Sequence, residues 1–490
     1  MVRGAVWMLL FKWVERGLGL LSTLVLVRLL SPTDFGMVSM ALSFIFMGEL
    51  LSAFSFDVAL IQNQNATDEH YHSAWTANIL LGSCISLVMF CLAVPISHFY
   101  KQPAVMPVIC ALAFGPLLSS LENIGIVAFR KNMDFRKEFI FQVSRKIIAF
   151  CVTVPLAFSL RSYWALVAGI LASKLASTGL SYWVQPFRPR LSIRELGSLL
   201  RFSRWLLLNN FVVFLKERSS DFVLGRIFGP TSLGIYNVSG EFASIPANEI
   251  GAPINRALLP GFAKMVGDRQ MITDAFSNAI GMLALIAIPA GAGIFAVSHF
   301  LVPVVLGTKW LAGVPVMEVL GLNSAIFVFH GTIVTVLVAS GRPFAATRVS
   351  MISVAVMLAG MFTLPHKFGP LGAALAVLLA SVVSTPIYLL QLRKYAGVPL
   401  RKFFQVVLRP SLASFGMIAA VRLALPPYAL GMSSSRAGLL LASGVGVGAF
   451  AFVFILLALW FLMGKPQGAE RQVLSRVVTR LPVWIPVPGR

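Results

Sequence analysis

Apolar stretches long enough to cross a bilayer follow one another along almost the whole chain, and they limit its fold more than any other feature. A helix needs about 20 apolar residues to span the hydrocarbon core. Of 490 residues, 58% are hydrophobic and only 12% are charged, with a mean hydropathy of +0.84. Soluble domains carry about 25% charged residues. Lipid therefore solvates most of this chain, and we expect an all-α, polytopic membrane protein.

The apolar stretches number about fourteen. Several contain proline, which packed membrane helices tolerate because neighbouring groups satisfy the freed carbonyls. The connecting loops stay below about twenty residues, which leaves no room for a soluble catalytic domain. The expected spans are 7–30, 37–61, 74–98, 104–129, 138–158, 163–184, 202–227, 235–259, 275–298, 313–339, 345–364, 370–390, 405–424 and 437–463.

The net charge of +22 indicates topology rather than nucleic-acid binding. No phosphate loop, zinc-finger spacing or RNA-binding motif is found, so we expect no nucleic-acid partner. Lys and Arg gather in the cytoplasmic loops if both termini lie inside, as the positive-inside rule requires. The loop 62–73 is an exception, because it holds Asp68 and Glu69 and no Lys or Arg.

The cysteines and the N-terminus add little chemistry. All four cysteines lie inside apolar stretches without metal-ligand spacing, so we expect no disulfide, metal site or cofactor. The apolar stretch that begins at Trp7 contains charged residues and lacks a small-residue cleavage site. It is typical of a retained first helix rather than a signal peptide.

An internal repeat divides the chain. Residues 28–36 (RLLSPTDFG) match 226–234 (RIFGPTSLG), with Arg, Pro, Thr and Gly at the same offset of 198 positions. This offset spans six helices, and an even number preserves orientation, so the repeats are parallel, as in some transporters. We expect two six-helix lobes, 1–198 and 199–404, followed by two further helices and a basic tail in 405–490.

Charged residues inside the spans are the candidate functional groups, because each costs about 2.5–3.5 kcal/mol on insertion scales and so faces a cavity or a partner. They concentrate in the first helix of each repeat. The candidate cavity cations are Lys12, Arg16, Lys216 and Arg218. The candidate cavity or ion-coupling carboxylates are Glu15, Glu49, Glu217, Asp221 and Glu241.

Structural explanations compete with these assignments. Basic residues near helix ends extend to the interface without any further role, which explains Arg145, Lys146 and Arg226. For the cluster at 216–221 we favour a functional role, and the alternative is an ion-pair network that stabilises the helix bundle. Glu122 and Lys174 are further embedded charges without an assigned role.

Two segments carry a family resemblance. Residues 26–61, which include the first copy of the repeated motif, and residues 199–268, which include DFVLGRIFGP at 221–230, resemble the Wzx-type polysaccharide flippases. These belong to the multidrug/oligosaccharidyl-lipid/polysaccharide exporter superfamily. The resemblance implies two lobes facing a central cavity, alternating access and a polyprenyl-diphosphate-linked oligosaccharide as cargo, for export of exopolysaccharide, capsule or the O-antigen of lipopolysaccharide. The cavity cations would then bind the diphosphate.

The resemblance also implies a setting and partners. The protein would lie in the bacterial inner membrane, among membrane lipids, with H+ or Na+ as coupling ion and a polymerase and export machinery as partners. A flippase changes no covalent bond, so no catalytic residue and no enzyme activity are expected.

Other functions remain open from the residues alone. A cation-coupled multidrug antiporter of the same superfamily would have mainly acidic residues in its cavity, whereas cations are mixed in here. A lipid II flippase is also compatible with the pattern. A polysaccharide polymerase or ligase would need a long outer loop, and a membrane scaffold would not explain charges in matched helices.

Overall fold

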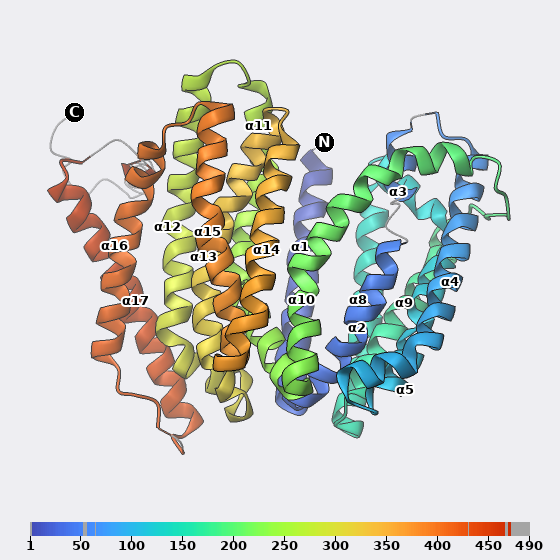
Figure 1. Ribbon diagram of the computed structural model, residues 1–490, viewed down its shortest axis with the longest axis horizontal. Helices are drawn as coiled ribbons and strands as arrows, with labels where there is room; N and C mark the ends of the chain where they lie inside the picture. The colour runs from blue at the N-terminus through green and yellow to red at the C-terminus, as the bar shows by residue number, and fades with distance from the viewer. Residues whose placement is uncertain (1, 52–55, 64, 430, 466–468, 472–490) are drawn as a thin grey trace. The chain divides into compact units, whose positions relative to one another are not determined.

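The computed structural model describes residues 2–51, 56–63, 65–429, 431–465 and 469–471, and it describes side chains in these ranges except at 2–13, 51, 58, 62 and 198–209. Every element in the described ranges is a helix (Figure 1), so the prediction of an all-α chain is confirmed. The chain divides into two compact units, residues 1–237 and 238–490. The lobe boundaries expected from the repeat remain a prediction.

The first unit contains nine α-helices, one short 3-10 helix and most of a tenth α-helix that continues into the second unit. The helices are α1 (Val2–Leu29), α2 (Pro32–Leu51), α3 (Phe56–Gln62), α4 (Asp68–Tyr100), α5 (Val105–Leu112), α6 (Phe114–Ser120), η1 (Ile124–Ile126), α7 (Val127–Lys131), α8 (Phe135–Leu160), α9 (Trp164–Val184) and α10 (Leu196–Ala243).

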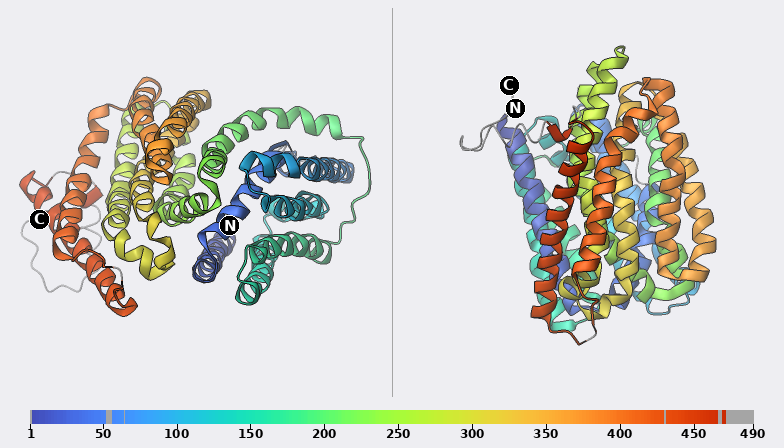
Figure 2. Two further views of the ribbon diagram at one scale, coloured as in Figure 1. Left: turned by 60° about the horizontal axis from the view of Figure 1, so that its bottom comes forward. Right: turned by 90° about the vertical axis from the view of Figure 1, so that its left-hand side faces the viewer.

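The second unit begins within α10 and is a helical bundle (Figures 1 and 2). Its further helices are η2 (Pro246–Gly251), α11 (Ala252–Lys264), α12 (Arg269–Leu301), η3 (Val302–Leu306), η4 (Thr308–Gly313), α13 (Val314–Ala339), α14 (Pro343–Phe368), α15 (Pro370–Ala396), α16 (Leu400–Ala424) and α17 (Ser434–Leu462).

Ten helices in the described residues are long and apolar enough to cross a membrane, or eleven if the bent pair Val105–Ser120 and Ile124–Lys131 forms one span. The chain is therefore a multi-pass membrane protein. Each expected stretch falls mainly on helix where it is described, and the stretch 104–129 is interrupted at 121–123. The number of fourteen spans stays a prediction.

Each unit has its own helix packing. In the first unit α8 packs against α1 and α9, while α4 packs against α5 and α6. In the second unit α12, α13 and α15 share a core that includes Phe276, Ile333 and Leu389. The membrane-facing sides of these helices keep large apolar residues exposed, as lipid solvation allows.

The repeated motif forms two matching turns within the first unit. Pro32 begins α2, and Gly229, with a positive φ of 78°, breaks α10 directly before Pro230. Pro suits the first turn of a helix and Gly adopts positive φ without strain. The two turns meet, because Thr33 Oγ1 lies 2.8 Å from Thr231 Oγ1. These threonines are equivalent across the repeat.

Two glycines of the motif allow the helices behind these turns to cross in backbone contact. A Cβ on Gly36 would collide with the carbonyl group of Pro230. A Cβ on Gly234 would collide with the carbonyl group of Pro32. The contact is thus reciprocal, as in a two-fold symmetric interface. Only glycine lets both backbones approach this closely.

Substitution of Gly36 by Ala tests the crossing. The added methyl group has no space against the Pro230 carbonyl, so we expect a loss of about 1–3 kcal/mol in the free energy of unfolding, as in other overpacked sites. Thermal unfolding of the purified protein in lipid nanodiscs measures it. The matched control is Gly179→Ala in α9, where a Cβ meets no atom within 4 Å. Equal melting temperatures for the two variants would contradict the crossing.

Candidate functional site

Ion pairs link the membrane helices of the first unit. The Oε1 atom of Glu15 in α1 lies 3.6 Å from Nζ of Lys146 in α8, and the Oε1 atom of Glu49 in α2 lies 3.5 Å from Nζ of Lys174 in α9. A partner reduces the cost of a carboxylate inside a membrane helix. Sequence reasoning had found both carboxylates but not their partners, because it assigned Lys146 to the interface and gave Lys174 no role.

Further polar groups of the first unit lie on α1 and in the break after α6. Arg16 is half-buried on α1, next to Glu15. The carboxylate of Glu122, in the break between α6 and η1, accepts a hydrogen bond of 2.8 Å from the Ser177 hydroxyl of α9. The side chain of Lys12, which sequence analysis assigned to the cavity, lies outside the described residues.

The charged residues of α10 differ in burial and do not all lie on one side of the helix. Asp221 is buried, with 1% of its surface exposed, and its carboxylate lies 3.4 Å from Nη1 of Arg218. It also accepts a hydrogen bond of 3.1 Å from the Asn237 amide. The guanidinium group of Arg218 lies over the ring of Phe46 in α2, 4.4 Å from its centroid. Glu217 is exposed on another side of the helix.

Two further predicted positions differ in burial. Lys216 is partly buried, and Glu241, in the second unit, is exposed. Asp221 and Arg218 are two predicted residues that the fold brings together. Asp221 orients the guanidinium group of Arg218, which keeps about a third of its side chain, 33%, exposed.

An apolar groove of about 520 Å³ lies in the second unit between α12, α13, α15 and α16. Phe329, Leu389, Phe403, Phe404 and Phe415 are among its lining residues. Thr385, Ser411 and Ser414 supply its few polar groups. Such a surface suits a hydrocarbon chain better than a charged or hydroxylated ligand.

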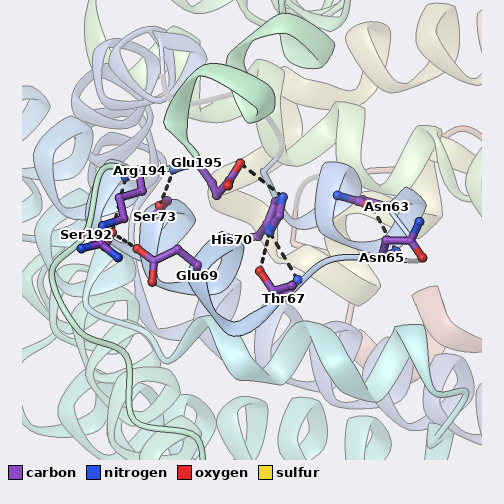
Figure 3. Close-up of polar contacts among 9 residues, drawn as sticks. All are labelled: Asn63, Asn65, Thr67, Glu69, His70, Ser73, Ser192, Arg194 and Glu195. Carbon is purple, nitrogen blue, oxygen red and sulfur yellow. Dashed lines mark hydrogen bonds and ion pairs between the residues drawn. The ribbon is translucent and has the colours of Figure 1, made fainter.

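The segment 185–195, which joins α9 to α10 and is called the linker, is bound to the start of α4 (Figure 3). Glu69 accepts a hydrogen bond from the Ser192 hydroxyl. The Nε2 atom of His70 lies 3.5 Å from the carboxylate of Glu195. Side chains at the start of α4 thus hold the linker against this helix.

Histidine and phenylalanine side chains extend this contact along the linker. Nδ1 of His72 accepts a hydrogen bond of 3.0 Å from the backbone N–H of Arg190. The His72 ring stacks on Phe187, with centroids 5.2 Å apart. The carbonyl group of Phe187 accepts a bond of 2.6 Å from the Asn123 amide.

The linker explains why the loop 62–73 departs from the positive-inside pattern. Its acidic residues have local structural roles. Glu69 binds the linker, and Asp68 lies in the first turn of α4, where the helix dipole favours a negative charge. Sequence reasoning missed this contact, because polar residues in two loops more than 100 positions apart give no sign that they meet.

Removal of His72 should loosen the linker. His72→Ala removes both the acceptor for Arg190 and the stacking surface for Phe187, so we expect faster tryptic cleavage at the arginines of 185–195. Limited proteolysis of the purified protein, followed by mass spectrometry, measures the rate. The control is His98→Ala at the other end of α4, where the residue is exposed. Equal cleavage of the two variants would show that the linker does not depend on His72.

Among the described residues no group of three or more His, Cys, Asp or Glu side chains could hold a metal ion.

Comparison with known proteins gives consistent matches. A family model described as polysaccharide biosynthesis protein matches residues 25–315. The lipopolysaccharide biosynthesis protein WzxC of Escherichia coli K12 is 25% identical over 411 residues, which cover 82% of this chain and 83% of the relative. The succinoglycan biosynthesis transport protein ExoT of Rhizobium meliloti 1021 is 26% identical over 345 residues, 69% of each chain.

The fold also matches a solved structure. The lipid II flippase MurJ in an inward closed conformation aligns with a TM-score of 0.75 and 13% identity, covering 94% of this chain and 100% of that chain. At this identity the likeness concerns the fold.

Proposed function

Because the chain belongs to the polysaccharide biosynthesis protein family, we propose that it is a flippase that moves a polyprenyl-diphosphate-linked oligosaccharide across the bacterial inner membrane. The names of its relatives, which include a transport protein for succinoglycan and a lipopolysaccharide biosynthesis protein, support this cargo class. The sugars would pass to the outer side for assembly into an exported polysaccharide. No bond is made or broken in this process.

The observation that carries the proposal is the set of cations on membrane helices of the first unit. Arg16, Lys146 and Arg218 come from three different helices, α1, α8 and α10. Lys146 and Arg218 each lie beside a carboxylate and remain partly exposed. A diphosphate can exchange with such carboxylates, because phosphate oxygens accept charge-assisted hydrogen bonds from the same donors.

The apolar groove of the second unit supports a lipid-linked cargo. Its wall is almost entirely aliphatic and aromatic. An isoprenoid chain has the same chemistry, and its transfer from lipid into the groove removes no polar group from water. The tail of the cargo would lie in this groove.

Coupling to an ion gradient is part of the proposal. Protonation or Na+ binding at an embedded carboxylate would alter its ion pair and hence the preference for one conformation. Of the predicted coupling carboxylates, Asp221, Glu15 and Glu49 each lie beside a lysine or arginine. Glu217 and Glu241 are more exposed alternatives. Both termini would lie in the cytoplasm, and the polymerase and export machinery would receive the product.

Arg218 provides the test. A null mutant of the native host is complemented with wild type, Arg218→Ala or Arg226→Ala, and surface polysaccharide is measured at matched protein levels. We expect Arg218→Ala to reduce export about tenfold or more, since a hydrogen bond to a charged group contributes about 1.5–3 kcal/mol. Arg226 is the matched control, because it is exposed on the same helix.

Two results would contradict the proposal at different levels. Equal export with Arg218→Ala and Arg226→Ala would remove Arg218 from cargo binding. Normal export in the null mutant, in a host with no second flippase, would reject the flippase function and favour a drug antiporter.

A further inference from the structure

Two adjoining polar cavities lie inside the first unit. One, of about 240 Å³, lies between α3, α4, the break after α6, α7 and α8. The other, of about 310 Å³, involves α2, α4, α6 and α9. Asn78 and Ser119 line both. We call the two together the Asn78 cavity. Its total size falls in the range of small-ligand pockets, about 300–1,000 Å³.

The charges around the Asn78 cavity nearly cancel. Arg130 lies between two carboxylates, with Nε 2.5 Å from Glu138 and Nη1 3.8 Å from Asp57. Lys174 and Glu49 pair across the second part. Glu122 and Arg145 add one charge of each sign. A diphosphate would need an excess of cations and a metal ion an excess of carboxylates. A neutral, highly polar ligand fits this wall better than either.

Hydrogen-bonding groups remain available in the wall. The Arg145 guanidinium donates from Nη2 to Oε1 of Gln142 at 2.6 Å, which fixes its orientation. Its buried Nε and the buried hydroxyl of Ser119 have no partner among the residues that the structure describes. Buried polar groups are normally satisfied, so each such group is a place where a ligand hydroxyl can bind.

Aromatic side chains complete the lining. Phe129 and Phe141, both buried in the unit, form part of the wall of the first cavity. A sugar ring presents hydroxyl groups at its edge and C–H groups on its faces. Planar amide, guanidinium and carboxylate groups can bind the edge, while an aromatic ring can pack against a face. Amides, ion-paired charges and aromatic rings together are therefore the chemistry that a sugar requires.

From this combination we propose that the Asn78 cavity is a sugar-binding subsite that takes sugar residues distal to the diphosphate of the cargo and so selects the oligosaccharide. The proposal rests on the proposed function. The cavity has no surplus of cations, so the diphosphate would bind elsewhere. Asn78 contributes an amide to both parts of the cavity, and Gln142 contributes one to the first part and orients Arg145.

The test compares two cargos in vesicles that contain the purified protein. One is polyprenyl diphosphate carrying the complete repeat unit of the host, and the other is the same lipid carrying its first sugar alone. Transfer between leaflets is followed by the accessibility of the sugar to a membrane-impermeant reagent. Variants are Asn78→Leu and Gln142→Leu, with Asn132→Leu as matched control because Asn132 is exposed and lies outside the cavity.

We expect Asn78→Leu to slow transfer of the complete unit roughly 2- to 12-fold, the effect of one hydrogen bond, and to leave transfer of the single-sugar lipid unchanged. Asn132→Leu should match wild type on both lipids. Gln142→Leu should show the same selective loss, and it carries the test if Asn78→Leu does not fold.

Three results overturn the subsite. Equal slowing of both lipids would assign the cavity to coupling or to stability. No slowing of either lipid would exclude a role in cargo selection. Failure of wild type to transfer either lipid would reject the proposed function itself, a result distinct from the first two.

Discussion

Backbone N–H and C=O groups in hydrocarbon have no water to bind, and the structure depends on this constraint. It explains why every described element is helical. It also limits where a helix may be interrupted, because the freed groups must find partners in protein. Two interruptions occur where proline and glycine make them tolerable, at Gly229–Pro230 in α10 and at the π-helix Pro246–Gly251 that follows. At the first of these, the turn at Gly229–Pro230 packs against the equivalent turn at Pro32.

Charge placement follows from the same solvent. A lone charge in a membrane helix is costly, so the embedded carboxylates of the first unit, Glu15, Glu49 and Asp221, each lie beside a cation. These pairs stabilise the bundle, yet their cations stay partly exposed and can exchange partners. A region of paired charge is thus compatible with an anionic cargo. The Asn78 cavity, which the Glu49–Lys174 pair lines, differs because amide and hydroxyl groups remain beside its paired charges.

Periodicity and composition are sufficient to predict the membrane helices, because burial in lipid imposes long apolar runs. The turn at Pro32 is also predictable, since Pro and Gly have strong local preferences. The partners of the charges are not, because Glu15 and Lys146 meet only through the packing of α1 on α8. The contact between the linker and α4 is not predictable from the sequence either, for the same reason. The one sequence sign of this contact is that the acidic loop 62–73 departs from the positive-inside charge pattern.

The most direct test of the flippase is the leaflet in which its cargo accumulates when the protein is depleted. Lipid-linked repeat units would be extracted from spheroplasts of the native host after labelling of outward-facing sugars with a membrane-impermeant hydrazide following mild periodate oxidation. The account predicts that depletion raises the amount of lipid-linked repeat units and leaves them unlabelled, because they stay in the cytoplasmic leaflet. Labelling to the same extent as in undepleted cells would contradict it.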